Sequence, residues 1–193
     1  GGGGGASDDT LSGGGGTDTV SYALADKAVV IDLSADIATG QGTDVLSGFE
    51  NATGGIKADT LIGNSGRNVL DGSRGADRMT GGFGNDTYIV DNVEDKVIET
   101  SNSVVGGLVL PGTGEGQAGG GTIDKVIASA NYSLAKVDFV ENLELSGKAS
   151  RASGNALANV VTGNGGADTL SVGSGNDTLD GGSGGELLKG GGG

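Results

Sequence analysis

Residues 81–89 read GGFGNDTYI and residues 172–180 read VGSGNDTLD, so nearly the same nine-residue phrase occurs twice in the chain. Each copy opens with a glycine-rich turn, carries an aspartate at its sixth position and has an apolar residue at its eighth position. The same phase runs unbroken through two long stretches, 54–98 and 154–189. Further copies with this pattern lie at 4–12, 13–21, 39–47 and 119–127. A flexible glycine-rich linker has no reason to keep such a phase, so we interpret the unit as a structural repeat.

The composition favours a partner that is a metal cation. The chain has 193 residues, of which 44 are glycine, and its 25 acidic against 11 basic residues give a net charge of −14. This excess of negative charge argues against nucleic acids and anionic membrane surfaces as partners, and it suits a hard divalent cation that prefers oxygen ligands. The chain has no Cys and no His, which removes disulfides, thiolate metal sites and the commonest general base. No apolar stretch is long enough for a membrane span.

Each nine-residue unit divides into a six-residue turn and a three-residue strand. Glycine allows the tight backbone of the turn, and the strand points position eight to one face and positions seven and nine to the other. Two units then make one coil of eighteen residues, and stacked coils form two parallel sheets that face each other across a thin core. Stacking also aligns the sixth positions in columns, for which we expect Asp59–Asp77–Asp95, Asn68–Asp86, Asn159–Asp177 and Asp168–Glu186.

Carboxylates stacked about 4.8 Å apart, the spacing of neighbouring strands, repel each other unless a cation lies between them. Calcium takes six to eight oxygen ligands from carboxylates and carbonyls, and a groove between two such turns offers both. A single apolar side chain per unit gives a small core, so we expect several calcium ions to supply part of the folding free energy.

The unit GGxGxDxUx, in which U is apolar, resembles the repeats-in-toxin (RTX) calcium-binding nonapeptide. The copies that match it best lie at 13–21, 81–89, 163–171 and 172–180, and segments that resemble the connectors of that family lie at 45–62, 84–99 and 140–147. The resemblance implies an all-β fold, a right-handed parallel β-roll or β-helix solenoid with calcium-binding turns. It also implies export by type I secretion and folding outside the cell, where calcium is plentiful.

The resemblance further implies a set of metal ligands, with carboxylates from position six and turn carbonyls from positions two and four. The carboxylates expected to bind calcium are Asp9, Asp18, Asp59, Asp77, Asp86, Asp95, Asp168 and Asp177. The carbonyls expected to bind it are those of Gly14, Gly16, Gly75, Gly82, Gly84, Gly166, Gly173 and Gly175. Departures from the pattern at Lys57, Asn68, Leu157, Asn159 and Glu186 predict weaker sites at their turns.

Two segments outside the repeat are predicted to be further strands of the same sheets. Residues 28–34 place Val29, Ile31 and Leu33 on one face, and residues 137–145 offer Phe139 with Leu143 and Leu145 as core side chains. We therefore expect one continuous solenoid divided as 1–50 (N-terminal repeat pair and strands), 51–99 (central roll), 100–121 (glycine-rich insert), 122–151 (connecting strands) and 152–193 (C-terminal roll). The insert is interpreted as a protruding hairpin or as a contact for a neighbouring subunit.

The functional prediction is a secreted protein of the extracellular space or cell surface that binds calcium. The chain has no HExxH, no GxSxG and no phosphate-binding loop, and the repeat already accounts for most aspartates, so we expect no catalysis. One hypothesis is a structural component of a surface layer, adhesin or filament, with self-association into filaments or arrays. The alternative is the C-terminal secretion and folding module of a secreted enzyme, such as a protease or lipase, whose catalytic domain lies elsewhere.

Overall fold

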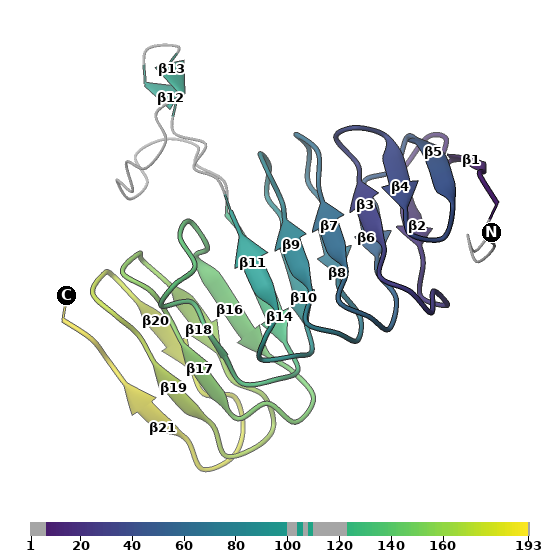
Figure 1. Ribbon diagram of the computed structural model, residues 1–193. Coiled ribbons are helices and arrows are strands. Elements are labelled where there is room, and N and C mark those ends of the chain that lie inside the picture. Colours follow the sequence, from purple (N-terminus) through teal and green to yellow (C-terminus); the bar gives the residue numbers. More distant parts are fainter. Residues whose placement is uncertain (1–6, 100–103, 106–107, 110–122, 193) are drawn as a thin grey trace. The chain divides into compact units, whose positions relative to one another are not determined.

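The computed structural model describes residues 7–99, 104–105, 108–109 and 123–192, and all regular secondary structure in these residues is β-strand (Figure 1). The chain divides into two compact units, the first made of Gly1–Gly82 with Asp86–Ile98 and the second of Phe83–Asn85 with Glu99–Gly193. Within the described residues, no helix is long and apolar enough to span a membrane.

The first unit consists of short strands that stack side by side (Figure 1). Its strands are β1 (Thr10–Ser12), β2 (Thr19–Ser21), β3 (Val30–Asp32), β4 (Ile37–Thr39), β5 (Thr43–Ser47), β6 (Asn51–Thr53), β7 (Thr60–Ile62), β8 (Val69–Asp71), β9 (Arg78–Thr80), β10 (Thr87–Val90) and β11 (Lys96–Ile98). One sheet has the order β1-β5-β4-β3-β7-β9-β11, and β2, β6, β8 and β10 pair in that order in the other. Thr60 pairs with Arg78, and Val69 pairs with Thr87, so successive coils are offset by eighteen residues as the repeat predicts.

The second unit repeats this arrangement. Its strands are β12 (Val104–Val105), β13 (Leu108–Val109), β14 (Lys125–Ala128), β15 (Tyr132–Ser133), β16 (Asn142–Leu145), β17 (Arg151–Ser153), β18 (Val160–Thr162), β19 (Thr169–Ser171), β20 (Thr178–Asp180) and β21 (Leu187–Lys189). Parallel pairing gives the orders β14-β16-β18-β20 and β15-β17-β19-β21. The all-β, parallel β-roll predicted from the repeat is therefore the fold that each unit adopts.

The core consists mainly of the eighth positions. Leu61, Leu70, Met79, Tyr88 and Leu170 are 0 % exposed, whereas their strand neighbours at positions seven and nine are half-buried or exposed. A three-residue strand can bury only its central side chain, because its two flanking side chains point to the opposite face. The thin core predicted from the sequence is confirmed.

One part of the first unit departs from a purely parallel roll. Strands β3 and β4 pair antiparallel, as do β4 and β5, so the chain folds back twice before it resumes the parallel stack. The predicted strand around Ile31 is confirmed, and Val29, Ile31 and Leu33 are all buried. This reversal cannot be predicted from the sequence pattern, because antiparallel strands show the same alternation of buried and exposed residues as parallel strands.

The prediction that Phe139 belongs to the core is wrong. Phe139 has a positive φ of 63° and lies half-buried in a turn, while Val137 and Val140 on either side are buried. The expected strand begins only at Asn142, and the predicted core residues Leu143 and Leu145 are buried. Six residues of turn are needed before each strand, and they take up the first part of the segment.

In the 100–121 insert, the structure describes two short strands, in which Val104 pairs with Val109 and Val105 with Leu108 as an antiparallel hairpin. The remainder of that prediction lies outside the described residues.

Candidate metal sites

The turns between strands stack so that each sixth position contacts the sixth position one coil away. The backbone N–H of Asp59 donates to Oδ1 of Asp77 at 2.8 Å, and that of Asp77 donates to Oδ1 of Asp95 at 2.9 Å. On the other edge of the first unit, the N–H of Asn68 donates to Oδ1 of Asp86 at 2.8 Å. Two of the columns expected from the eighteen-residue spacing, Asp59–Asp77–Asp95 and Asn68–Asp86, are therefore joined by hydrogen bonds.

A second hydrogen bond closes several of the described turns on themselves, including those with Asp59, Asn68, Asn159 and Asp168 at position six. The N–H at position two donates to the side chain at position six, as from Gly55 to Asp59 Oδ2 (2.5 Å) and from Asn164 to Asp168 Oδ2 (2.7 Å). The side chain at position six is thus buried and held in place: Asp59 is 2 % exposed, and Asp77 and Asp168 are each 1 % exposed.

Four carboxylates in these turns keep an oxygen that is buried and has no hydrogen-bond partner among the described residues. These oxygens are Asp18 Oδ2, Asp77 Oδ2, Asp168 Oδ1 and Glu186 Oε1. A buried carboxylate oxygen without a donor is costly, because it has lost its hydration and gained nothing in return. A calcium ion would supply the missing partner, so these residues fit the metal that the repeat implies.

Burial also changes the acidity of the columns. Desolvation, together with the negative charges of Asp95, Asp59 and Asp91, raises the pKa of Asp77 to about 7. Desolvation likewise raises the pKa of Asp59 and of Asp95. The metal-free column therefore resists ionisation, and a divalent cation would favour the ionised form.

Some glycines at position four lie against carbonyl oxygens of the turn one coil earlier. A Cβ at Gly75, whose φ is 146°, would overlap the carbonyl oxygen of Lys57 one coil earlier. A Cβ at Gly175, whose φ is 131°, would likewise overlap the carbonyl oxygen of Leu157. The absence of a side chain at position four thus lets the backbone of one turn lie close to the carbonyl oxygen of the turn one coil earlier.

The predicted ligand residues differ in their surroundings. Asp9 is exposed and accepts a hydrogen bond from Ser7 Oγ, and Asp177 is half-buried and accepts one from the N–H of Asn159. Both oxygens of Asp59 already accept backbone N–H groups, from Val29 and Gly55. The predicted glycines Gly14, Gly16, Gly82 and Gly84 have positive φ, and Gly166 and Gly173 do not.

Two glutamates that were not among the predicted ligands also occupy sixth positions. Asp18 N–H donates to Glu50 Oε2 at 2.8 Å, and Asp124 N–H donates to Glu141 Oε2 at 2.9 Å. Burial, with a further contribution from the charge of Asp124, raises the pKa of Glu141 to about 7. The signal was present in the sequence, because each glutamate stands two residues before a buried position, Ala52 or Leu143.

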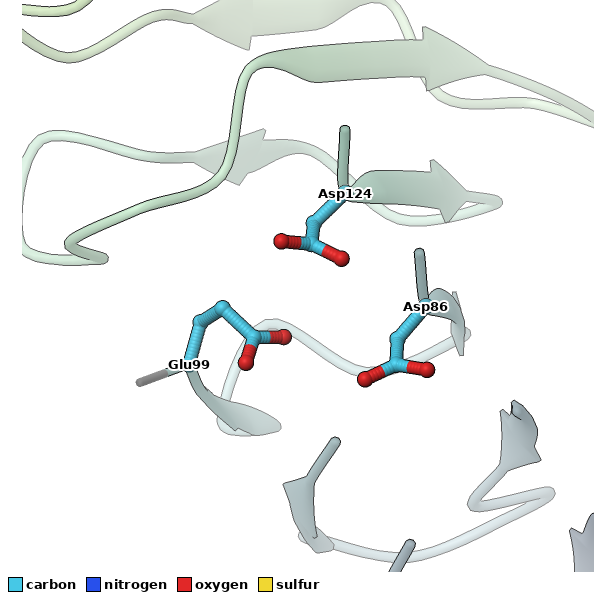
Figure 2. Close-up of side chains that lie close together, drawn as sticks. All are labelled: Asp86, Glu99 and Asp124. Atoms are coloured by element: carbon cyan, nitrogen blue, oxygen red, sulfur yellow. The ribbon is translucent and has the colours of Figure 1, made fainter. Parts of the chain in front are cut away.

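Another buried acidic pair lies in the second unit. Carboxylate oxygens of Glu99 and Asp124 lie within 4.8 Å of each other, and these residues are 7 % and 0 % exposed (Figure 2). Asp86, which the same figure labels, belongs to the first unit. Asp124 stands at the sixth position of the copy at 119–127, so its place in the turn follows from the repeat.

Another aspartate at a sixth position has a protein donor for each of its two carboxylate oxygens. Asp44, in the copy at 39–47, accepts hydrogen bonds from the hydroxyl of Tyr22 and from the N–H of Asp9 (2.9 Å for the latter). Tyr22 is 1 % exposed, and burial together with this hydrogen bond raises its pKa. A tyrosine hydroxyl thus satisfies Asp44, and the sequence offers no local sign of this contact.

The family model described as RTX calcium-binding nonapeptide repeat (4 copies) matches residues 4–23, 53–88 and 153–185. These segments are RTX calcium-binding nonapeptide repeats. Comparison with curated proteins gives no significant match. RTX repeats bind calcium, and the chain is accordingly a calcium-binding β-roll protein. RTX repeats and all-β repeat folds are typically non-catalytic, and RTX repeat proteins are generally secreted by the type I route.

Proposed function

We propose that this RTX chain is an extracellular structural protein whose β-rolls fold when several calcium ions bind between the stacked turns. The observation that carries the proposal is the set of buried carboxylate oxygens without a hydrogen-bond donor, on Asp18, Asp77, Asp168 and Glu186. Because the ions neutralise groups that repel each other in the folded state, calcium binding contributes directly to folding free energy.

The calcium dependence fits a protein that is exported unfolded. Sites in extracellular modules typically bind calcium at about 10⁻⁴–10⁻³ M, so they would be empty in a calcium-poor cytosol and filled outside the cell. The ligands proposed are the position-six carboxylates and the position-two and position-four carbonyls predicted from the repeat, with Asp77 and Asp168 as the main sites. Glu141 and Asp124 are proposed as further acidic groups of the second unit.

A structural role in a surface layer, adhesin or filament is the use that the fold supports best, because nearly all described residues belong to the rolls and their turns. The test is a calcium titration of the purified chain followed by circular dichroism, isothermal titration calorimetry and electron microscopy. We expect β-structure to appear with calcium and to be lost with chelator, and fibres or arrays to form only with calcium. A spectrum that does not respond to chelator would contradict calcium-driven folding. Folding on calcium without any assembly would instead favour a folding module of a larger secreted enzyme.

A further inference from the structure

Two turns of the rolls carry asparagine at both the second and the sixth position. They are GNSGRN at 63–68, which precedes β8, and GNALAN at 154–159, which precedes β18. Asn68 is 0 % exposed and Asn159 is 1 % exposed, so both amides at position six are buried as deeply as the aspartates of the other turns. We call these two segments the asparagine turns.

In the first unit, the side-chain amides of this turn donate to carbonyl oxygens one coil earlier. Asn68 Nδ2 donates to the carbonyl of Glu50 at 2.6 Å, and Asn64 Nδ2 donates to the carbonyl of Phe49 at 3.3 Å. The amide oxygens are also used, since Asn68 Oδ1 accepts from the N–H of Asn64 and Asn64 Oδ1 accepts from the N–H of Gly66. The side chains therefore close the turn and join it to the preceding coil.

The second unit shows the same arrangement on different neighbours. Asn155 Nδ2 donates to the carbonyls of Val137 (3.0 Å) and Val140 (2.9 Å), and Asn159 Nδ2 donates to those of Val140 (3.3 Å) and Glu141 (3.2 Å). Asn159 Oδ1 accepts from the N–H of Asn155 at 2.8 Å. In both units, the asparagine side chains of the turn thus donate to backbone carbonyls of the preceding coil.

The chemistry of these contacts differs from that of the aspartate turns. An aspartate at position six would direct an oxygen toward the carbonyl oxygens of the preceding coil, and oxygens facing oxygens need a cation between them. Asparagine directs an N–H₂ group there and supplies two donors without charge. Among the described residues, Asp77 and Asp168 each keep a buried oxygen without a partner, and neither Asn68 nor Asn159 has such an atom.

An intermediate case shows which position decides. In the turn at 163–168, Asn164 Nδ2 donates to the carbonyl of Ala149 at 2.7 Å, as in the asparagine turns. Position six of that turn is Asp168, whose Oδ1 still has no partner in the described structure. An amide at position two alone therefore leaves the need for a cation in place.

The asparagine turns occupy equivalent places in the two units. Along one edge of the first unit, the sixth positions are Asp18, Glu50, Asn68 and Asp86, and along one edge of the second unit they are Asp124, Glu141, Asn159 and Asp177. The side-chain amide of each asparagine donates to the backbone carbonyl of the glutamate one coil earlier. The backbone N–H of each asparagine donates to the aspartate one coil later, at 2.8 Å to Asp86 and 2.9 Å to Asp177. Each asparagine turn thus orients the aspartate of the next turn.

We propose that the asparagine turns at 63–68 and 154–159 are closed by their side-chain amides in place of calcium, and that each sets the register of its roll before the neighbouring sites fill. This inference rests on the proposed function, because it concerns which turns of a calcium-dependent roll take the ion. The amide nitrogen at position six and a cation would occupy the same position beside the carbonyl oxygen of the preceding glutamate, so position six holds one or the other.

The test compares Asn68→Asp and Asn159→Asp with the unmodified chain and with Asn176→Asp, in which the same charge is added at an exposed position of a turn. We expect each of the first two variants to need about tenfold more calcium at the folding midpoint, because the donors to the preceding carbonyls are lost. Calorimetry should count the same number of ions or about one more per chain. An unchanged midpoint, or fewer bound ions, would overturn the proposal.

Hydrogen exchange on the unmodified chain gives a second readout that needs no variant to fold. At a calcium concentration below the midpoint, amides in 63–71 and 154–162 should exchange more slowly than those in 72–80 and 163–171. Equal or faster exchange in the asparagine turns would contradict their closure without calcium. If the unmodified chain does not fold on calcium at all, the proposed function fails. If the unmodified chain folds on calcium, and the Asn68→Asp and Asn159→Asp variants have the same calcium midpoint of folding as that chain, only this inference fails.

Discussion

The backbone N–H of Asp59 donates a 2.8 Å hydrogen bond to Oδ1 of Asp77, which lies eighteen residues later in the sequence and one coil further along the roll. The contact binds one aspartate to the next through a donor that bears no full charge. It uses only one oxygen of Asp77, and Oδ2 remains buried without a partner in the described structure. Hydrogen bonds therefore order the turn, but one buried carboxylate oxygen still lacks a partner, which a cation can supply.

Replacing Asp77 by asparagine should remove a calcium ligand and also remove the buried negative charge that has no partner without the ion. We expect Asp77→Asn to bind about one ion fewer, because the carboxylate is lost, and to be the more stable chain in chelator. Isothermal titration calorimetry measures the first effect, and the β-structure retained in chelator, followed by circular dichroism, measures the second. Asp138→Asn, at an exposed position, is the matched control and should change neither. Equal ion counts in the two variants would exclude Asp77 as a ligand.

The core prediction concerns the eighth position. Leu170 is 0 % exposed and lies at the centre of β19, so Leu170→Ala should destabilise the calcium-bound fold by about 2–5 kcal/mol. Denaturant unfolding in saturating calcium measures the loss. Leu24→Ala, at a residue 89 % exposed, should change stability by about 0.5 kcal/mol or less. Similar losses in both variants would argue against position eight as the source of the core.

The hydroxyl of Tyr22 should matter through Asp44. Tyr22→Phe removes a donor from a carboxylate that is 3 % exposed, so we expect a loss of about 1–3 kcal/mol. Asp44→Asn should reduce that loss, since a neutral side chain is less costly to leave without the hydroxyl. A double-mutant cycle measured by chemical unfolding tests the coupling, and strictly additive effects would show that the two side chains do not interact.

Acid should stabilise the rolls when calcium is absent. The pKa of Asp77 is raised by burial to about 7, above its ordinary value of 3.8, and the pKa of Glu141 is raised to about 7. A raised folded-state pKa gives stability that is fully present below the unfolded pKa and is lost as pH rises through the folded pKa. In chelator, the chain should therefore retain more β-structure, measured by circular dichroism, at about pH 5 than at about pH 8.

With saturating calcium, the same comparison should reverse, because the ion binds the deprotonated carboxylates and protons compete with it. A loss of β-structure on acidification in chelator would contradict the raised pKa values of Asp77 and Glu141.

Much of this structure could be predicted from periodicity. Local rules predict that position six lies in a turn and that position eight is buried. Six residues suffice for a turn, and a three-residue strand buries its central side chain. The columns of acids followed from the same count, since two units make one coil and partners lie eighteen residues apart. The contact between Asp59 and Asp77 thus followed from the sequence alone.

Other features depended on contacts that no local pattern encodes. Strands β3, β4 and β5 reverse direction with the same alternation of buried and exposed residues that parallel strands show, and Tyr22 donates to Asp44, which lies 22 residues later in the sequence. Phe139 has the apolar character of a core residue but lies in a turn with positive φ.

The nonapeptide phase alone determined that this chain is a roll of acidic turns with a thin apolar core, because each unit's turn and strand depend only on the residues within it. Tertiary structure alone decided which sixth positions are satisfied by the protein and which still need a cation. That choice depends on whether a hydroxyl, an amide or nothing faces the buried oxygen from another coil, as at Asp44, Asn68 and Asp77.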